Sequence, residues 1–164
     1  MKVKNYIKYV NFKPVTLEGM YAGNEFILNN LKENIKNIIE LEAPITLNTL
    51  KQRLREALNV KKISQKALDI ILEDINKLNI VVTNNLYDEV YWTKSGVFMI
   101  DELRINSNRQ IYDIPYQELK VLVYDLNLRK EELYRAILNY FGYEVLTEKA
   151  RKYLEFVEDI CYKN

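Results

Sequence analysis

Apolar side chains recur every three or four residues between positions 25 and 78, which is the spacing that places them on one face of a helix. The pattern predicts three helices, over residues 25–41, 46–58 and 64–78. Short polar side chains that accept hydrogen bonds from free backbone N–H groups are expected to cap them. These capping residues are Asn24, Thr46 and Ser64.

The hydrophobic period changes after the third helix. Residues 80–82 are all β-branched, Asn84 and Asn85 favour a turn, and residues 90–92 suit a returning strand. Three helices followed by a hairpin is the order of a winged helix, a variant of the helix-turn-helix class. The sequence therefore predicts a winged helix in the first half of the chain.

The second half predicts another helical unit. Its helices are expected over residues 116–126, 129–141 and 147–162, with one short strand near residues 97–100. Gly142 follows the second of these helices, where a glycine readily adopts the left-handed conformation that ends a helix.

These patterns predict three parts of the chain and a fold class. Residues 1–24 are expected to form an extended arm or linker, and residues 25–95 the winged-helix unit. Residues 96–164 are expected to form a second, winged-helix-like unit of three helices packed on the first. The predicted class is mainly α with a small β-hairpin, within the α+β class.

Composition narrows the possible chemistry. Hydrophobic residues make up 48% of the chain and charged residues 29%, which is normal for a soluble globular protein. Histidine is absent and Cys161 is the one cysteine, which excludes imidazole catalysis, multi-cysteine metal sites and an intramolecular disulfide. We therefore predict no enzyme activity, no cofactor and no metal. The sequence contains neither a signal-peptide pattern nor a membrane-spanning run, so we expect a cytoplasmic protein without membrane contact.

Two blocks of residues resemble a pattern in one bacterial protein family. The first block contains Glu42, Pro44, Ile45, Leu50, Arg53, Leu54 and Ala57. The second contains Arg109, Ile111, Ile114, Pro115, Glu118 and Leu119, followed by Arg129, Glu132, Leu133, Phe141 and Gly142. Together they resemble a domain of unknown function at the carboxyl end of large bacterial superfamily I helicase-like proteins. The likeness covers about residues 35–160.

In those proteins the domain follows the ATPase and, often, a very-short-patch-repair-like nuclease segment. The resemblance implies a non-catalytic, winged-helix accessory module of a DNA-processing or defence protein. It also implies a helicase or ATPase region as a partner, in the same chain or in another one.

Charge favours the first half of the chain as the DNA-binding part. Residues 1–84 contain 13 basic and 9 acidic side chains, whereas residues 85–164 contain 11 and 14. Phosphate contacts need basic side chains and capped helix starts. The predicted nucleic-acid contacts are Lys51, Arg53, Arg55, Lys61, Lys62, Lys66 and Lys94. Lys51, Arg53 and Arg55 are expected to lie largely off the apolar face of their helix.

Several alternatives remain open from the sequence. The net charge of +1 and the 13 tyrosines also fit a module for protein–protein interaction or self-association without nucleic-acid contact. Tyr87, Tyr91 and Trp92 could stack on bases, although packing of the hairpin is the commoner role for such residues. Acidic residues of the predicted third helix, such as Asp69 and Glu73, would oppose contact with phosphates. The sequence leaves open the oligomeric state, and whether the chain is a whole protein or a terminal domain.

Overall fold

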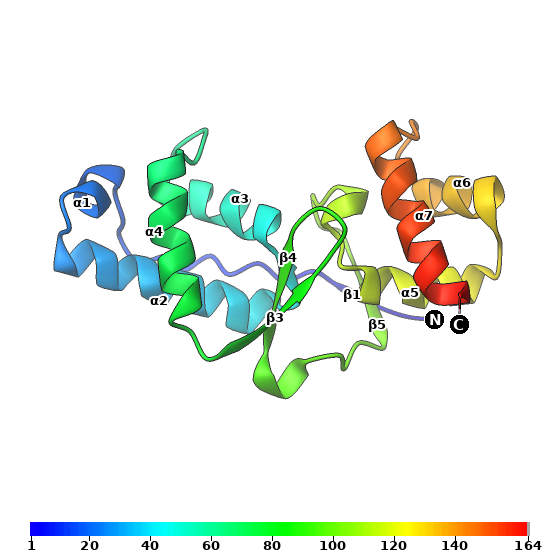
Figure 1. Ribbon diagram of the computed structural model, residues 1–164, viewed down its shortest axis with the longest axis horizontal. Helices are drawn as coiled ribbons and strands as arrows, with labels where there is room; N and C mark the ends of the chain where they lie inside the picture. The colour runs from blue at the N-terminus through cyan, green and yellow to red at the C-terminus, as the bar shows by residue number, and fades with distance from the viewer. Residues whose placement is uncertain (164) are drawn as a thin grey trace. The chain divides into compact units, whose positions relative to one another are not determined.

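The computed structural model describes residues 1–163 and shows a mainly helical α+β protein. The chain forms two compact units (Figure 1). The amino unit consists of Ile7–Thr83 and Val90–Val97. The carboxyl unit consists of Met1–Tyr6, Asn84–Glu89 and the chain from Phe98 onward. Residues 1–24 are thus divided between the units, with the first six in the carboxyl unit.

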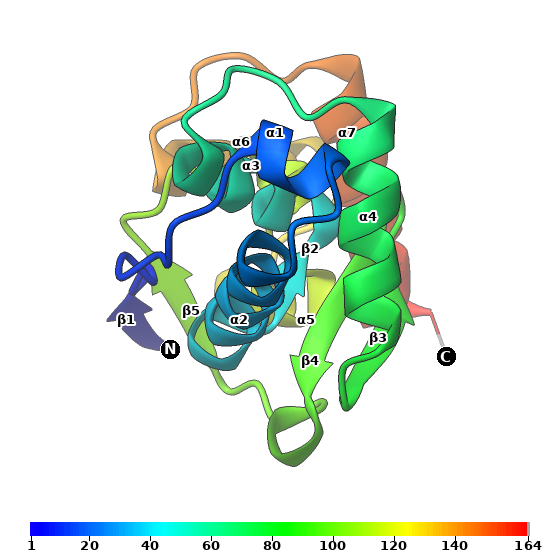
Figure 2. The same cartoon turned by 90° about the vertical axis from the view of Figure 1, so that its left-hand side faces the viewer.

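Three helices in the predicted positions make up most of the amino unit. They are α2 (Glu25–Glu42), α3 (Leu47–Leu58) and α4 (Gln65–Asn76). Asn24, Thr46 and Ser64 accept the expected capping hydrogen bonds from backbone N–H groups three residues later. Figure 2 shows α2 among α3, α4 and a short additional helix, α1 (Leu17–Tyr21). Their buried side chains include Leu31, Ile35, Ile38, Leu50, Leu54 and Ile71.

A three-stranded antiparallel sheet accompanies these helices. Its strands are β2 (Ile45–Thr46), β3 (Ile80–Asn84) and β4 (Glu89–Thr93), in the order β2-β4-β3. The predicted hairpin is confirmed. β2, in which Ile45 pairs with Tyr91, was not predicted, because two residues are too short to show a hydrophobic period.

The carboxyl unit contains the other three predicted helices, α5 (Tyr116–Leu126), α6 (Lys130–Phe141) and α7 (Glu148–Tyr162). They pack on one another around a core that includes Leu119, Leu133, Ile137 and Tyr153. The last turn before α5 is a 3-10 helix, η2 (Ile111–Asp113). Gly142 ends α6 in the left-handed conformation, with φ 78°, as predicted. Within residues 1–163 no helix is both long and apolar enough to cross a bilayer.

The strand predicted over residues 97–100 is wrong. The chain there follows a 3-10 helix, η1 (Lys94–Gly96), and Phe98 has a left-handed φ of 59°, which a β-strand does not accommodate. The strand forms later, as β5 (Glu102–Ile105), and pairs in parallel with β1 (Lys2–Asn5). Burial explains the shift, because Leu103 of β5 is fully buried whereas Met99 is 76% exposed.

Two arginines surround one buried carboxylate in the carboxyl unit. Arg104 on β5 and Arg109 before η2 each place a guanidinium nitrogen 2.7 Å from Oε2 of Glu118 on α5. The ring of Tyr6 lies under both guanidinium groups, 4.7 Å from each. Burial alone would raise the pKa of Glu118, but the charges of Arg109 and Arg104 and their hydrogen bonds lower it to about 2. Glu118 is therefore ionised in the folded protein.

The lowered pKa of Glu118 predicts a pH dependence of stability. In the unfolded chain this carboxyl has its usual pKa of 4.5, so the unfolded state takes up the proton first as the pH falls. The stabilisation, about 3 kcal/mol, is present above pH 4.5 and is lost as the pH falls toward 2. We expect the difference in unfolding free energy between wild type and Glu118→Gln to shrink over this range in urea titrations. A difference that stayed constant with pH would contradict this assignment.

Candidate nucleic-acid interface

The turn that joins α3 to α4 presents two lysines to solvent. Asn59 ends α3 with a left-handed backbone, φ 54° and ψ 47°, which asparagine tolerates better than most residues. The side chain of Ile63 is buried and anchors the turn, and Arg55 donates a hydrogen bond across it to the carbonyl of Lys61, at 3.1 Å. Lys61 and Lys62 are left exposed.

The start of α4 adds a third exposed lysine beside this turn. The hydroxyl of Ser64 accepts the N–H of Ala67 at 3.2 Å and lies 2.6 Å from the phenol oxygen of Tyr21 on α1. The ammonium of Lys66 sits 4.6 Å from the centre of the Tyr21 ring. This contact between cation and aromatic ring holds Lys66 near the amino end of the helix.

Four of the predicted contact residues thus lie at the α3–α4 corner: Arg55, Lys61, Lys62 and Lys66. Lys51 lies one turn before Arg55 on α3, so these two side chains share a face of that helix. We call the group the corner cations: Lys51, Arg55, Lys61, Lys62 and Lys66. Among residues 1–163 none of them has a carboxylate oxygen within 4 Å. Lys51 and Arg55 are half-buried, and the three lysines that follow are exposed.

Arg53 does not belong to this surface, and its prediction as a contact residue is corrected. Its side chain is 3% exposed and pairs with Glu42 of α2, at 3.1 Å, and with Glu56. Burial disfavours its charge, but the two carboxylates raise the pKa of Arg53 above its usual value. Spacing in the sequence does not single out Arg53, because Lys51 stands as close to Leu54 along α3 as Arg53 does to Leu50.

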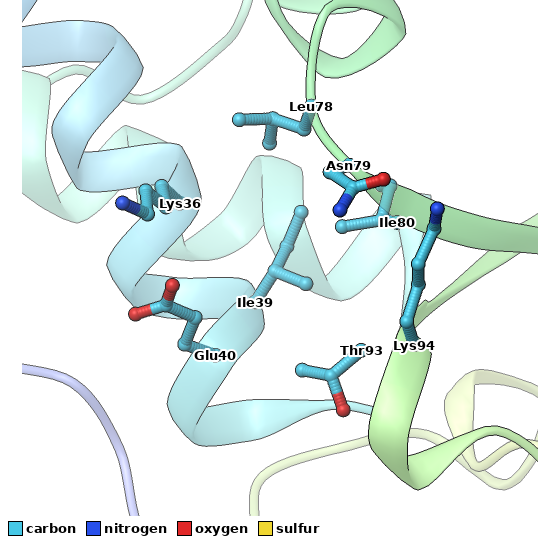
Figure 3. A pocket seen from close by; sticks show the side chains of 8 residues that line it. All are labelled: Lys36, Ile39, Glu40, Leu78, Asn79, Ile80, Thr93 and Lys94. Carbon is cyan, nitrogen blue, oxygen red and sulfur yellow. The ribbon is translucent and has the colours of Figure 1, made fainter.

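Lys94 lies away from the corner cations. It lines a hollow of about 280 Å³ with Lys36 and Glu40 of α2 and with Asn79, which follows the carboxyl end of α4 (Figure 3). Lys66 and the turn before it sit at the other end of this 12-residue helix, roughly 18 Å away along its axis. Lys94 and the corner cations therefore form separate surfaces.

Acidic side chains follow Lys66 along the exposed side of α4. Asp69 and Glu73 occupy the positions one and two turns after Lys66, and both are exposed. Asp69 accepts a hydrogen bond from the amide of Gln65, at 2.8 Å. Positive charge is thus confined to the first turn of α4, and the rest of its exposed side would repel a phosphate backbone.

The aromatic residues of the hairpin do not form an exposed base-stacking platform. Tyr91 and Trp92 on β4 are buried, and the indole N–H of Trp92 donates to Thr83 at 2.8 Å. In the carboxyl unit Tyr87 stacks on Tyr153 and its hydroxyl donates to the carbonyl of Lys149. Tyr91 and Trp92 therefore pack in the interior, whereas Tyr87 stays 41% exposed, with the Lys149 ammonium 5.0 Å from its ring centre.

Four charged residues of the two sequence blocks form buried ion pairs. Glu42 and Arg53 pair in the amino unit, and Arg109 and Glu118 pair in the carboxyl unit. All four side chains are at most 4% exposed. These four residues belong to the interior of the fold, whereas Arg129 and Glu132, which follow the second block, are exposed.

Comparisons of the chain with protein-family models, with curated proteins and with solved structures found no match.

Proposed function

We propose that the amino unit is a winged helix that binds the phosphate backbone of DNA through the corner cations. The element order α2-β2-α3-α4-β3-β4, with β2 and the hairpin in one sheet, supports this classification. The observation that carries the proposal is a run of five basic side chains without carboxylate partners, from the second half of α3 through the turn to the first turn of α4. The sequence resemblance adds the context of a non-catalytic accessory module of a helicase-type protein.

The charge pattern of α4 favours binding to the backbone over reading of bases. Base readout in the helix-turn-helix class uses the amino-terminal residues of the second helix of the motif, which lies in the major groove. In α4 the exposed Asp69 follows Lys66 within the first two turns, and Glu73 follows one turn later. The proposed binding is therefore largely independent of DNA sequence and steeply dependent on salt, with a slope of roughly −0.9 per phosphate contacted in a plot of log affinity against log salt.

Reversing the charge of two corner cations should weaken DNA binding strongly. We expect Lys61→Glu/Lys62→Glu to lower the affinity for duplex DNA about tenfold or more at low salt, because two phosphate contacts become repulsive. The measurement is fluorescence anisotropy of labelled single-stranded, duplex and forked DNA, titrated at low and moderate salt.

The matched control is Lys36→Glu/Lys94→Glu, which makes the same charge change on the surface of Figure 3. It should lose much less affinity than the corner variant. Equal losses of DNA affinity in the two double variants would show that binding depends only on net charge, and would contradict a specific site at the corner cations. A wild-type chain that bound none of the three DNAs at low salt would overturn the proposed function and favour the protein-interaction alternative.

A further inference from the structure

A second hollow of the amino unit lies beside α2 and the end of α4, with a volume of about 650 Å³. We call it the lysine hollow, after its lining residues: Lys13, Asn29, Asn30, Lys32, Glu33, Lys36, Lys77, Leu78 and Asn79. This lining contains four lysines and three asparagines, with Leu78 as its one apolar residue and Glu33 as its one acidic residue. Sites of this size that bind small molecules are usually lined by apolar side chains. The polar lining therefore indicates a charged ligand.

The segment before α1 is fixed against α2 where Lys13 reaches this hollow. Asn34 of α2 accepts the backbone N–H of Lys13 at 2.7 Å and donates to the carbonyl of the same residue at 2.9 Å. Asn30 donates to the carbonyl of Pro14 at 2.8 Å, and the next residue, Val15, is buried. The backbone of Lys13 is therefore held in place, while its side chain remains exposed.

The positive charges of the lysine hollow are only partly compensated. Lys32 and Lys36 stand one turn apart on α2 and therefore share a face of this helix. Lys77 follows α4 and lies 3.8 Å from the exposed carboxylate of Glu73. Within residues 1–163, the other three lysines of the lining have no carboxylate oxygen within 4 Å. Like charges around one hollow repel one another, so a bound anion would relieve this repulsion.

The acidic side chains near Lys77 belong to a different hollow. Glu73 and Asp74 line an adjacent hollow of about 320 Å³, which shares Lys32 and Lys77 with the lysine hollow. In that hollow two carboxylates balance two ammonium groups. An anion therefore fits the lysine hollow better than the adjacent one.

Asparagine side chains supply the other polar groups of the lysine hollow. Asn30 is 8% exposed, and in the part of the chain that the structure describes its Oδ1 accepts no hydrogen bond. Asn29 and Asn79 are exposed. An amide both donates and accepts hydrogen bonds, so these side chains suit phosphate oxygens and the hydroxyl groups of a carrier.

We propose that the lysine hollow binds a compact anion with several phosphate groups, either a nucleoside triphosphate or a free oligophosphate. Each ammonium group binds phosphate as a point charge, and ammonium groups from three segments of the chain suit an anion with several charged groups. The site is separate from the corner cations, because Lys77 follows the carboxyl end of α4 and Lys66 lies in its first turn. Figure 3 shows the ammonium of Lys36 pointing away from Lys94, so the lysine hollow also differs from the hollow that Lys94 lines.

Calorimetric titration with inorganic tripolyphosphate tests the proposal. Wild type should bind tripolyphosphate about tenfold more tightly than inorganic phosphate at matched ionic strength, because several ammonium groups act on one ligand. Lys32→Gln/Lys36→Gln should lower the affinity for tripolyphosphate about tenfold or more. The matched control, Lys61→Gln/Lys62→Gln, removes the same charge from the corner cations and should leave this affinity nearly unchanged.

Two results would overturn the proposal. One is an equal loss of tripolyphosphate affinity in the two double variants, which would show binding to net charge alone. The other is a wild-type chain that binds tripolyphosphate no more tightly than phosphate. DNA affinity is judged separately, because Lys32→Gln/Lys36→Gln keeps all the corner cations.

The same titration with ATP identifies the source of the phosphates. Binding of ATP more tightly than tripolyphosphate would assign the site to nucleotides, and equal or weaker binding would assign it to free oligophosphates.

Chemical acetylation of wild type provides a test that needs no variant. Tripolyphosphate should slow the acetylation of the four lysines of the lysine hollow several-fold, as measured by mass spectrometry of peptides. Lys61 and Lys62 should react at an unchanged rate. Equal protection of all these lysines would contradict a defined site.

Discussion

Glu118→Gln should lower the free energy of unfolding of the carboxyl unit by about 3–5 kcal/mol at neutral pH, because removing one member of a buried ion pair leaves the other charge uncompensated. Here two guanidinium groups, those of Arg104 and Arg109, would remain buried against a neutral amide. The glutamine has nearly the same size as the glutamate, so the loss reports charge and hydrogen bonding and not a cavity. Far-UV circular dichroism in a urea titration measures it.

The matched control is Glu131→Gln in the same unit. Glu131 pairs with Arg151, but its side chain is 57% exposed, and an exposed pair of this kind contributes less than about 1 kcal/mol. The one tryptophan, Trp92, belongs to the amino unit and reports on that unit separately by fluorescence. If Glu118→Gln and Glu131→Gln lower the free energy of unfolding equally, the buried ion pairs of Glu118 have no special role in stability.

Arg53→Met should destabilise the amino unit by a similar amount, about 3–5 kcal/mol, because the Glu42 carboxylate would lose its guanidinium partner in a fully buried position. Methionine replaces most of the volume of the aliphatic stem but neither pairs with Glu42 nor donates to the carbonyl of Tyr9. A urea titration followed by Trp92 fluorescence measures the change. Lys51→Met on the same helix is the control, with an expected change within about 0.5–1 kcal/mol.

The double variant Glu42→Gln/Arg53→Met tests the reason for that loss. Replacing both members of a buried ion pair is often far less costly than removing one of them. The double variant should therefore regain most of the stability that Arg53→Met loses, and the coupling energy follows from the double-mutant cycle. A double variant as unstable as Arg53→Met would show that packing, and not the unpaired charge, determines the effect.

Local patterns in the sequence predicted most of the regular structure. The helices α2 to α7 lie within one or two residues of their predicted ends, because apolar spacing and capping residues act over short stretches of chain. The sequence also predicted the hairpin of β3 and β4, because its turn and its strands depend on neighbouring residues. Elements that depend on distant partners were missed, such as β5, which pairs with β1 at a separation of 100 residues, and the two-residue strand β2.

The candidate site was predictable only in part for the same reason. Lys61, Lys62 and Lys66 follow one another closely in the sequence, and the turn before α4 brings them together as expected. Lys94 is distant in sequence, and the fold places it near the opposite end of α4. Spacing alone could not assign Lys94 to a surface, because that depends on how β4 and η1 return past α2.

By itself the sequence determined where the helices and the hairpin form and how they are capped, since these depend on neighbours within a few residues. Only the tertiary structure decided which charged side chains reach solvent. Arg53 and Glu118 carry charges that a sequence pattern would assign to the surface, yet each is buried against a partner from another element. The physical reason is that a buried charge is tolerated only beside its counter-charge, and the fold alone brings the two together.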